Sequence, residues 1–205
     1  MLKSKGIIKN RNGKAYRYFT DYITNDFTTM ANLSSSEYVK ACWNRYQQNC
    51  PQKTNAVNGT IFEYIIETAL YNRGILPMFT QASVAFVPNA NFDILLYTDM
   101  NFPIGLSLKT SLRERYKQAD LEAIALKYVH RRALNYLITL SGDEADNVKE
   151  KISNGTLLGI NKVITADTVE FDDLCDELSS YSFVEPGKID IIESGFVIKS
   201  DEENL

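Results

Sequence analysis

The order of apolar segments between residues 60 and 140 is the feature that most restricts what this chain can fold into. A helical repeat begins near Thr60 and is followed by three short β-rich runs. Turn-forming segments separate these runs, which lie at 83–87, 92–97 and 104–108. A second helical repeat, at about 117–132, leads into an apolar run of strand length at 134–140. This order predicts an α/β fold with a central mixed β-sheet flanked by helices.

The second helical repeat has apolar residues at positions that would share one face. We expect its buried face to consist of Leu121, Ile124, Ala125 and Tyr128. The first repeat is expected to bury Phe62, Ile66, Ala69 and Leu70 and to stop at 72–74, where Asn and Gly are typical of a helix end.

The flanking regions have weaker patterns. Residues 1–33 are predicted to form an irregular arm or short strands, and Ser34-Ser35-Ser36-Glu37 is typical of a helix N-cap. The segment 51–59 is polar and loop-like. The further elements expected are a helix at 143–152, a strand at 156–164, a helix at 171–178 and a strand or hairpin at 189–198. We therefore predict one domain over 1–205, made of an arm and helix (1–57), a core (58–140) and a C-terminal elaboration (141–205).

Composition excludes several classes of protein. A chain of 205 residues that is 44% hydrophobic and 23% charged can bury a core without structural metals. The three cysteines are an odd number without close pairs, which favours a reducing, cytoplasmic location over a disulfide framework. With a single histidine, His130, a zinc site is not expected. There is no apolar run long enough to cross a bilayer and no secretory h-region, so no membrane association is expected.

The net charge of -4 gives no general support for binding nucleic acid. The charge is unevenly distributed, however. The stretch from Lys109 to Lys117, both included, has four basic residues and one acid, whereas much of the acidic excess is in the last third. A local basic stripe of this kind can contact phosphates even in an acidic protein.

Two charged residues lie at the ends of neighbouring predicted strands. Asp93 is the second residue of the run at 92–97, and Lys109 directly follows the run at 104–108. If these strands are antiparallel neighbours, the start of one lies beside the end of the other, and the two side chains meet. Ser107 and Lys109 would then share a face of the sheet. Taken singly, Asp93 is equally explained as a turn residue, and Lys109 as a solvated strand end.

Glu122 adds a second carboxylate about one turn into the helix that follows Lys109. A helix that returns over the sheet edge would direct Glu122 toward Asp93, although a solvent-facing glutamate is the ordinary alternative. Two carboxylates suit a hard divalent cation, most naturally Mg²⁺. Such a cation polarises a phosphate and acidifies a bound water, and a neighbouring lysine stabilises developing charge.

These residues resemble the PD-(D/E)xK nucleases, in particular type II restriction endonucleases. Asp93 matches the first motif position, and Ser107-Leu108-Lys109 matches the second, with serine in place of the usual acid. A subgroup that cuts CCGG-, CCNGG- and CCWGG-type sites has Ser-x-Lys and takes its missing acid from the following helix. Twelve residues separate Lys109 from Glu122 here, which fits that variant. The resemblance covers roughly residues 58–140 and implies Asp93 and Glu122 as metal ligands.

The same subgroup has an Arg-(Asp/Glu)-Arg element that reads CC/GG base pairs shortly after the lysine. Arg113-Glu114-Arg115 stands at that place, with Lys117 as a further DNA contact. Arginine suits bidentate contact with guanine, and a carboxylate accepts from the cytosine amino group. The alternative is a solvated helix-entry loop with a local salt bridge, and other target sequences stay open.

Three further residues compete for roles at the site. The resemblance implies a glutamate on the helix that precedes the sheet; Glu63 is preferred, and Glu67, one turn later, is its competitor. Asp99, in a turn, is the second choice for the position of Asp93. His130 is expected to be a polar residue of the helix surface or C-terminus rather than a ligand.

The resulting expectation is a type II restriction endonuclease that cuts double-stranded DNA at a short palindromic site. A palindrome is matched by a homodimer with one active site per strand. The alternatives are a repair or junction-resolving nuclease of the same fold and a catalytically inactive DNA-binding relative.

Overall fold

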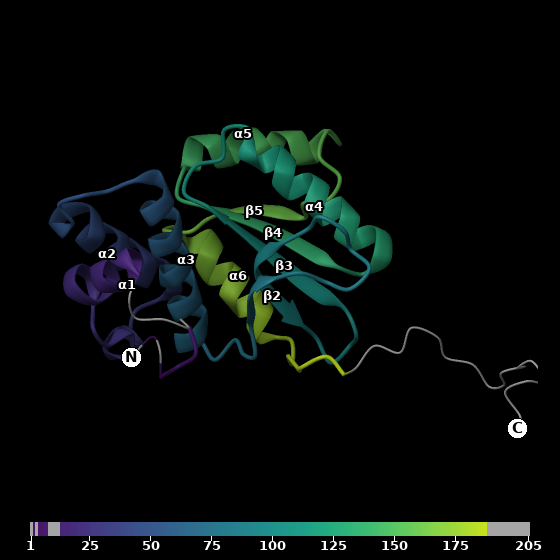
Figure 1. Ribbon diagram of the computed structural model, residues 1–205. Helices are drawn as coiled ribbons and strands as arrows, with labels where there is room; N and C mark the ends of the chain where they lie inside the picture. Colours follow the sequence, from purple (N-terminus) through teal and green to yellow (C-terminus); the bar gives the residue numbers. More distant parts are fainter. Residues whose placement is uncertain (1, 3, 8–12, 188–205) are drawn as a thin grey trace, which may run out of the picture.

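A five-stranded sheet lies between two layers of helices in the computed structural model, which describes residues 2, 4–7 and 13–187 (Figure 1). In sheet order the strands are β1 (Phe79–Ala82), β2 (Phe92–Tyr97), β3 (Pro103–Lys109), β4 (Leu134–Thr139) and β5 (Lys162–Thr165). The first three strands pair antiparallel, and β3, β4 and β5 pair parallel. With α3 (Asn55–Asn72) before the sheet and α4 (Arg115–Val129) between β3 and β4, the predicted mixed α/β fold is confirmed.

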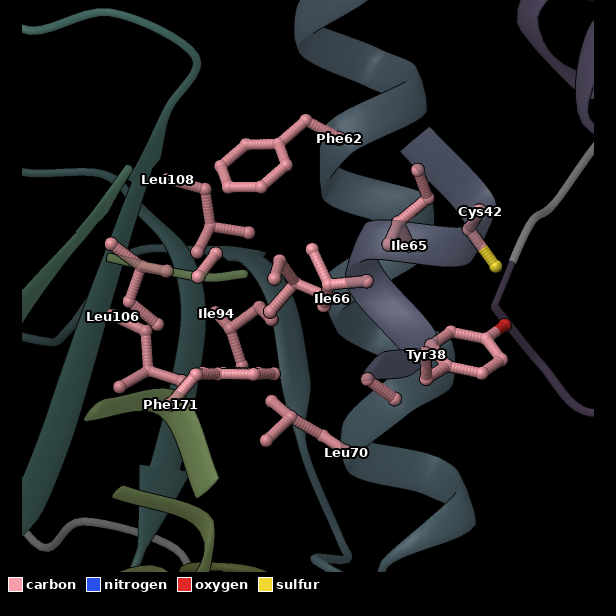
Figure 2. Packing of buried hydrophobic residues seen from close by; sticks show 14 of the residues in the cluster. Tyr38, Cys42, Phe62, Ile65, Ile66, Leu70, Ile94, Leu106, Leu108 and Phe171 are labelled. Carbon is pink, nitrogen blue, oxygen red and sulfur yellow. The ribbon is translucent and has the colours of Figure 1, made fainter. Parts of the chain in front are cut away.

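One face of the sheet is covered by α3 and by α6 (Val169–Ser179). Phe62, Ile65 and Ile66 of α3 belong to the same buried cluster as Ile94, Leu106 and Leu108 of the sheet, and Phe171 joins them from α6 (Figure 2). Because alternate side chains of β3 enter this cluster, Ser107 and Lys109 belong to the opposite face.

None of the helices in the described part of the chain is long and apolar enough to cross a bilayer.

The other face is covered by α4 and by α5 (Gly142–Ser153). The side chains of α4 that enter the core are small, Ala119 and Ala123, together with Leu126. The predicted buried face of this helix is wrong in its larger members, since Leu121 is 67% exposed and Tyr128 is 88% exposed, whereas Ala125 packs against the core. Small side chains let α4 approach its neighbours closely, and that close contact rather than side-chain size determines which face is buried.

Close packing against α4 is visible at residues 158–160. The buried carboxylate of Asp120 accepts hydrogen bonds from the backbone amides of Gly159 (2.7 Å) and Ile160 (3.1 Å). A Cβ at Gly159 would lie 2.6 Å from the Ile124 nitrogen and closer still to the Asp120 carbonyl oxygen. This contact fixes α4 at Asp120, two residues before Glu122.

The N-terminal region is helical rather than an irregular arm or short strands, so that prediction is wrong. It contains α1 (Lys14–Tyr18), a π-helical turn (Phe19–Ile23) and a 3-10 turn (Phe27–Met30). Its apolar residues recur at intervals of three or four and are buried: Ala15, Phe19, Ile23, Phe27 and Met30. The predicted N-cap is confirmed in α2 (Ser35–Asn49), where Ser34 and Glu37 form a capping box.

Several boundaries differ from the predicted ones. The first strand lies at Phe79–Ala82 instead of 83–87, because Val84 and Val87 pack from a loop whose residues Phe86 and Asn89 have left-handed φ angles. α3 begins inside the predicted loop 51–59, where Thr54 caps it by accepting from the Val57 amide. Within the predicted strand 156–164, pairing starts only at Lys162. The helices predicted at 143–152 and 171–178 are present as α5 and α6, and 189–198 lies outside the described residues.

Candidate active site

Asp93 and Lys109 form an ion pair at one end of the sheet. Asp93 Oδ2 accepts hydrogen bonds from Lys109 Nζ (2.8 Å) and from the Leu108 amide (2.6 Å). The two side chains are 13% and 14% exposed, so the pair is shielded from water but still reachable. The antiparallel pairing of β2 with β3 brings them together, because the start of β2 lies beside the end of β3.

Glu122 approaches this pair from α4. Its carboxylate accepts a hydrogen bond from Gln118 Nε2 (2.9 Å), one turn earlier on the helix. Burial raises the pKa of Glu122, and the negative charge of Asp93 raises it further, while the Gln118 hydrogen bond and the charge of Lys109 lower it. Glu122 therefore interacts electrostatically with both members of the ion pair, without a direct hydrogen bond to either.

Glu63 approaches from the opposite helical layer, on α3. Burial and the neighbouring charge of Asp93 raise the pKa of Glu63 to about 7, against opposing effects from Lys109 and from a hydrogen bond with Gln81 (3.2 Å). Glu67 is deeper, at 4% exposure, and its pKa is raised well above the usual value, first by burial and then by Glu63 and Asp93. Its Oε2 has no hydrogen-bond partner among the described residues. Of the two glutamates, Glu63 alone has Lys109 among the charges that act on its pKa.

The donor chemistry of these side chains fits a hard divalent cation. The carboxyl groups of Asp93, Glu63 and Glu122, from β2, α3 and α4, all interact electrostatically with Lys109. Mg²⁺ is commonly held by one or two carboxylates, with water and substrate phosphate as its other ligands. Among the described residues there is no group of three or more His, Cys, Asp or Glu that could hold a metal by themselves. Asp93 and Glu122 could therefore supply only part of the ligands of such a cation.

The segment between β3 and α4 carries the predicted DNA contacts, and we call residues 110–115 the arginine loop. Leu112 is fully buried, and its amide donates to Glu144 Oε2 of α5 (2.5 Å). Arg113 is exposed and has a left-handed φ of 37°. Arg115 is exposed at the start of α4, where its amide donates to the Leu112 carbonyl oxygen (2.6 Å).

Glu114 and Lys117 form an exposed ion pair beside these arginines. This local salt bridge is the one that the solvated-loop alternative expects, although it joins Glu114 to Lys117 and leaves both arginine side chains toward solvent. Exposed pairs of this kind contribute little to stability, so Glu114 can exchange partners at low cost.

The two remaining alternatives lie elsewhere. Asp99 follows the far end of β2, where its amide donates to the Ser182 carbonyl oxygen, so it is not beside Lys109. His130 ends α4 and borders an apolar cavity of about 450 Å³ lined also by Phe79, Leu95 and Tyr97. Burial lowers the pKa of His130.

Three contacting residues were not singled out from the sequence: Gln81, Gln118 and Glu144. The two glutamines hold the carboxylates of Glu63 and Glu122. Gln118 precedes Glu122 by four residues, and this helical spacing indicates that the two side chains are neighbours on α4. Glu144 in sequence indicates only an acid in the first turn of a helix, because its partner Leu112 is 32 residues away.

Comparison with known proteins gives one structural likeness. No family model matches the chain, and no curated protein matches it. A solved structure described as a restriction endonuclease PspGI-substrate DNA complex is similar, at 14% sequence identity and a TM-score of 0.47. The match covers 88% of this chain and 79% of that chain.

Proposed function

We propose that this chain is a Mg²⁺-dependent endonuclease that cuts double-stranded DNA at a short palindromic sequence, in the manner of a type II restriction endonuclease. The observation that carries the proposal is the shielded Asp93–Lys109 ion pair, with Glu122 on α4 near enough to interact electrostatically with both of its members. Two carboxylates can hold a divalent cation for phosphodiester hydrolysis, and a lysine beside them can stabilise charge that develops on the phosphate.

Each residue has a separate task in this reaction. Asp93 and Glu122 would hold the cation. The cation, when bound, would neutralise the scissile phosphate and acidify a coordinated water. Lys109 lies within 2.8 Å of Asp93, so its ammonium group can orient the attacking water and stabilise charge developing on the phosphate oxygens. Glu63, with a pKa of about 7, is suited to exchange a proton near neutral pH.

Sequence recognition is assigned to the arginine loop. Arg113 and Arg115 are exposed at the entrance to α4, shortly after the strand that ends at Lys109, and each can make a bidentate contact with guanine in the major groove. Glu114 can accept from cytosine amino groups, and Lys117 can contact phosphate. A homodimer would place two such loops on a two-fold axis, as a palindrome with CC/GG ends requires.

The decisive experiment is incubation with plasmid DNA in the presence of Mg²⁺ or of EDTA, followed by sequencing of the ends. We expect discrete fragments only with Mg²⁺ and a common sequence at every end. Cleavage restricted to branched or damaged substrates would instead favour a repair or junction-resolving nuclease. An absence of cleavage combined with duplex binding would favour an inactive DNA-binding protein.

Glu122→Gln is expected to weaken the use of Mg²⁺. The amide keeps the size of the side chain but removes a charged ligand, so half-maximal cleavage should require at least about tenfold more Mg²⁺. A Mg²⁺ titration of the cleavage rate measures this shift. Glu150→Gln, at an exposed glutamate of α5, is the matched control and should titrate like the wild type. Near-normal Mg²⁺ dependence of Glu122→Gln would contradict the assignment of this ligand.

Arg113→Ala and Arg115→Ala are expected to reduce discrimination between target sequences. Each loses a base contact of roughly 1–3 kcal/mol, so the preference for the cognate site over a single-base variant should fall by tenfold or more. The measurement is the ratio of cleavage rates on the two duplexes. Arg131→Ala, which removes an exposed arginine beyond the other end of α4, is the matched control and should leave the ratio intact.

A further inference from the structure

The arginine loop is attached to the protein through a residue of another helix. The amide of Leu112 donates to Glu144 Oε2 at 2.5 Å, and Glu144 lies in the first turn of α5. The Leu112 side chain is fully buried in a cluster with Ala119, Ala145 and Val148. Thus both the backbone and the side chain of Leu112 are fixed, directly before the first arginine.

Fixation at Leu112 matters because the next residue has an unfavourable conformation. Arg113 has a φ of 37°, in the left-handed region that side chains other than glycine seldom adopt. The turn closes where the Arg115 amide donates to the Leu112 carbonyl oxygen. Without an external contact, an exposed loop of this kind would relax toward ordinary φ values and move both arginine side chains.

We propose that Glu144 is a positioning residue that sets sequence discrimination by holding the arginine loop in its left-handed turn. The proposal rests on the proposed function, since it assigns Glu144 to the recognition part of that same site. In the described part of the chain, Glu144 makes no hydrogen bond or ion pair with Asp93, Lys109 or Glu122; it acts through Leu112 on Arg113 and Arg115. An arginine that reads a base needs a rigid support, because a bidentate contact tolerates little displacement.

The first test concerns the contact alone and does not depend on DNA. In Glu144→Ala, hydrogen exchange of the Leu112 amide, followed by NMR of the full chain, should become at least about tenfold faster. Glu144→Gln keeps an acceptor and should restore most of the protection. Asp143→Ala removes the neighbouring exposed acid of the same helical turn and should exchange as the wild type does. Unchanged exchange of Leu112 in Glu144→Ala would overturn the proposal.

The second test measures cleavage of the cognate duplex and of single-base variants. Glu144→Ala should lose about tenfold or more of the wild-type preference, with the loss on the cognate site in KM rather than in kcat, and Glu144→Gln should recover it. A merely structural role would change the rates on all duplexes alike. Wild-type protein that cuts no DNA would overturn the proposed function and this role together, whereas intact discrimination in Glu144→Ala would overturn this role alone.

Discussion

Lys109→Ala is expected to lower the rate of Mg²⁺-dependent DNA cleavage by at least about 100-fold, the usual effect of removing one group that stabilises the transition state. The ammonium group lies 2.8 Å from Asp93 and acts electrostatically on Glu63 and Glu122. Its removal takes away the positive charge that interacts with all three carboxyl groups. Single-turnover cleavage of a cognate duplex at saturating Mg²⁺ measures the loss without a contribution from product release.

A control must separate lost chemistry from lost stability. Lys162, at the start of β5, also forms an ion pair, with Glu177 at 2.7 Å, but lies away from the proposed site. Lys162→Ala should therefore leave cleavage unchanged. In Lys109→Ala the Asp93 carboxylate still accepts the hydrogen bond from the Leu108 amide. We therefore expect the free energy of unfolding to fall by only about 1–3 kcal/mol, measured by thermal unfolding. Folded Lys109→Ala protein with near-normal cleavage would contradict the assignment of the active site.

Gly159→Ala is expected to destabilise the fold by about 3 kcal/mol or more, at the upper end of the usual cost of overpacking. The added methyl group would meet backbone atoms of Asp120 and Ile124, which cannot rotate away as a side-chain tip can. The same displacement would strain the hydrogen bonds from Gly159 and Ile160 to Asp120. Chemical denaturation gives the change in the free energy of unfolding.

Gly142→Ala is the matched control, because a Cβ at Gly142 would have nothing within 4 Å. It lies at the start of α5, where alanine should be neutral or slightly stabilising. If the two variants unfolded at the same denaturant concentration, the close approach of residue 159 to α4 would be contradicted.

The sequence predicted the sheet and the meeting of Asp93 with Lys109 because both depend on local patterns. Alternation and turn residues locate β2 and β3, and antiparallel pairing then brings the two charges together. The buried face of α4 was not predictable in this way. Leu121 and Tyr128 are the larger apolar residues, but the contacts of α4 select Ala119 and Ala123, and the sequence does not state how closely two elements pack.

Contacts between single residues far apart in the sequence could not be predicted either. Glu144 and Leu112 belong to different elements, and neither residue type is unusual where it stands. The strand expected at 83–87 failed for a similar reason. Val84 and Val87 are apolar because they cover α4 from a loop, and a short apolar run does not reveal whether it pairs as a strand.

The placement of acidic residues on both sides of the sheet has a consequence for the folding of the protein. Glu63 belongs to α3 on one face of the sheet, and Glu122 belongs to α4 on the other face. Asp93 and Lys109 belong to the sheet between these helices. A newly made chain whose sheet has formed but whose helices have not docked would therefore hold an incomplete set of acidic groups. For the proposed nuclease, recovery of cleavage during refolding should coincide with the docking of the last helix rather than with formation of the strands.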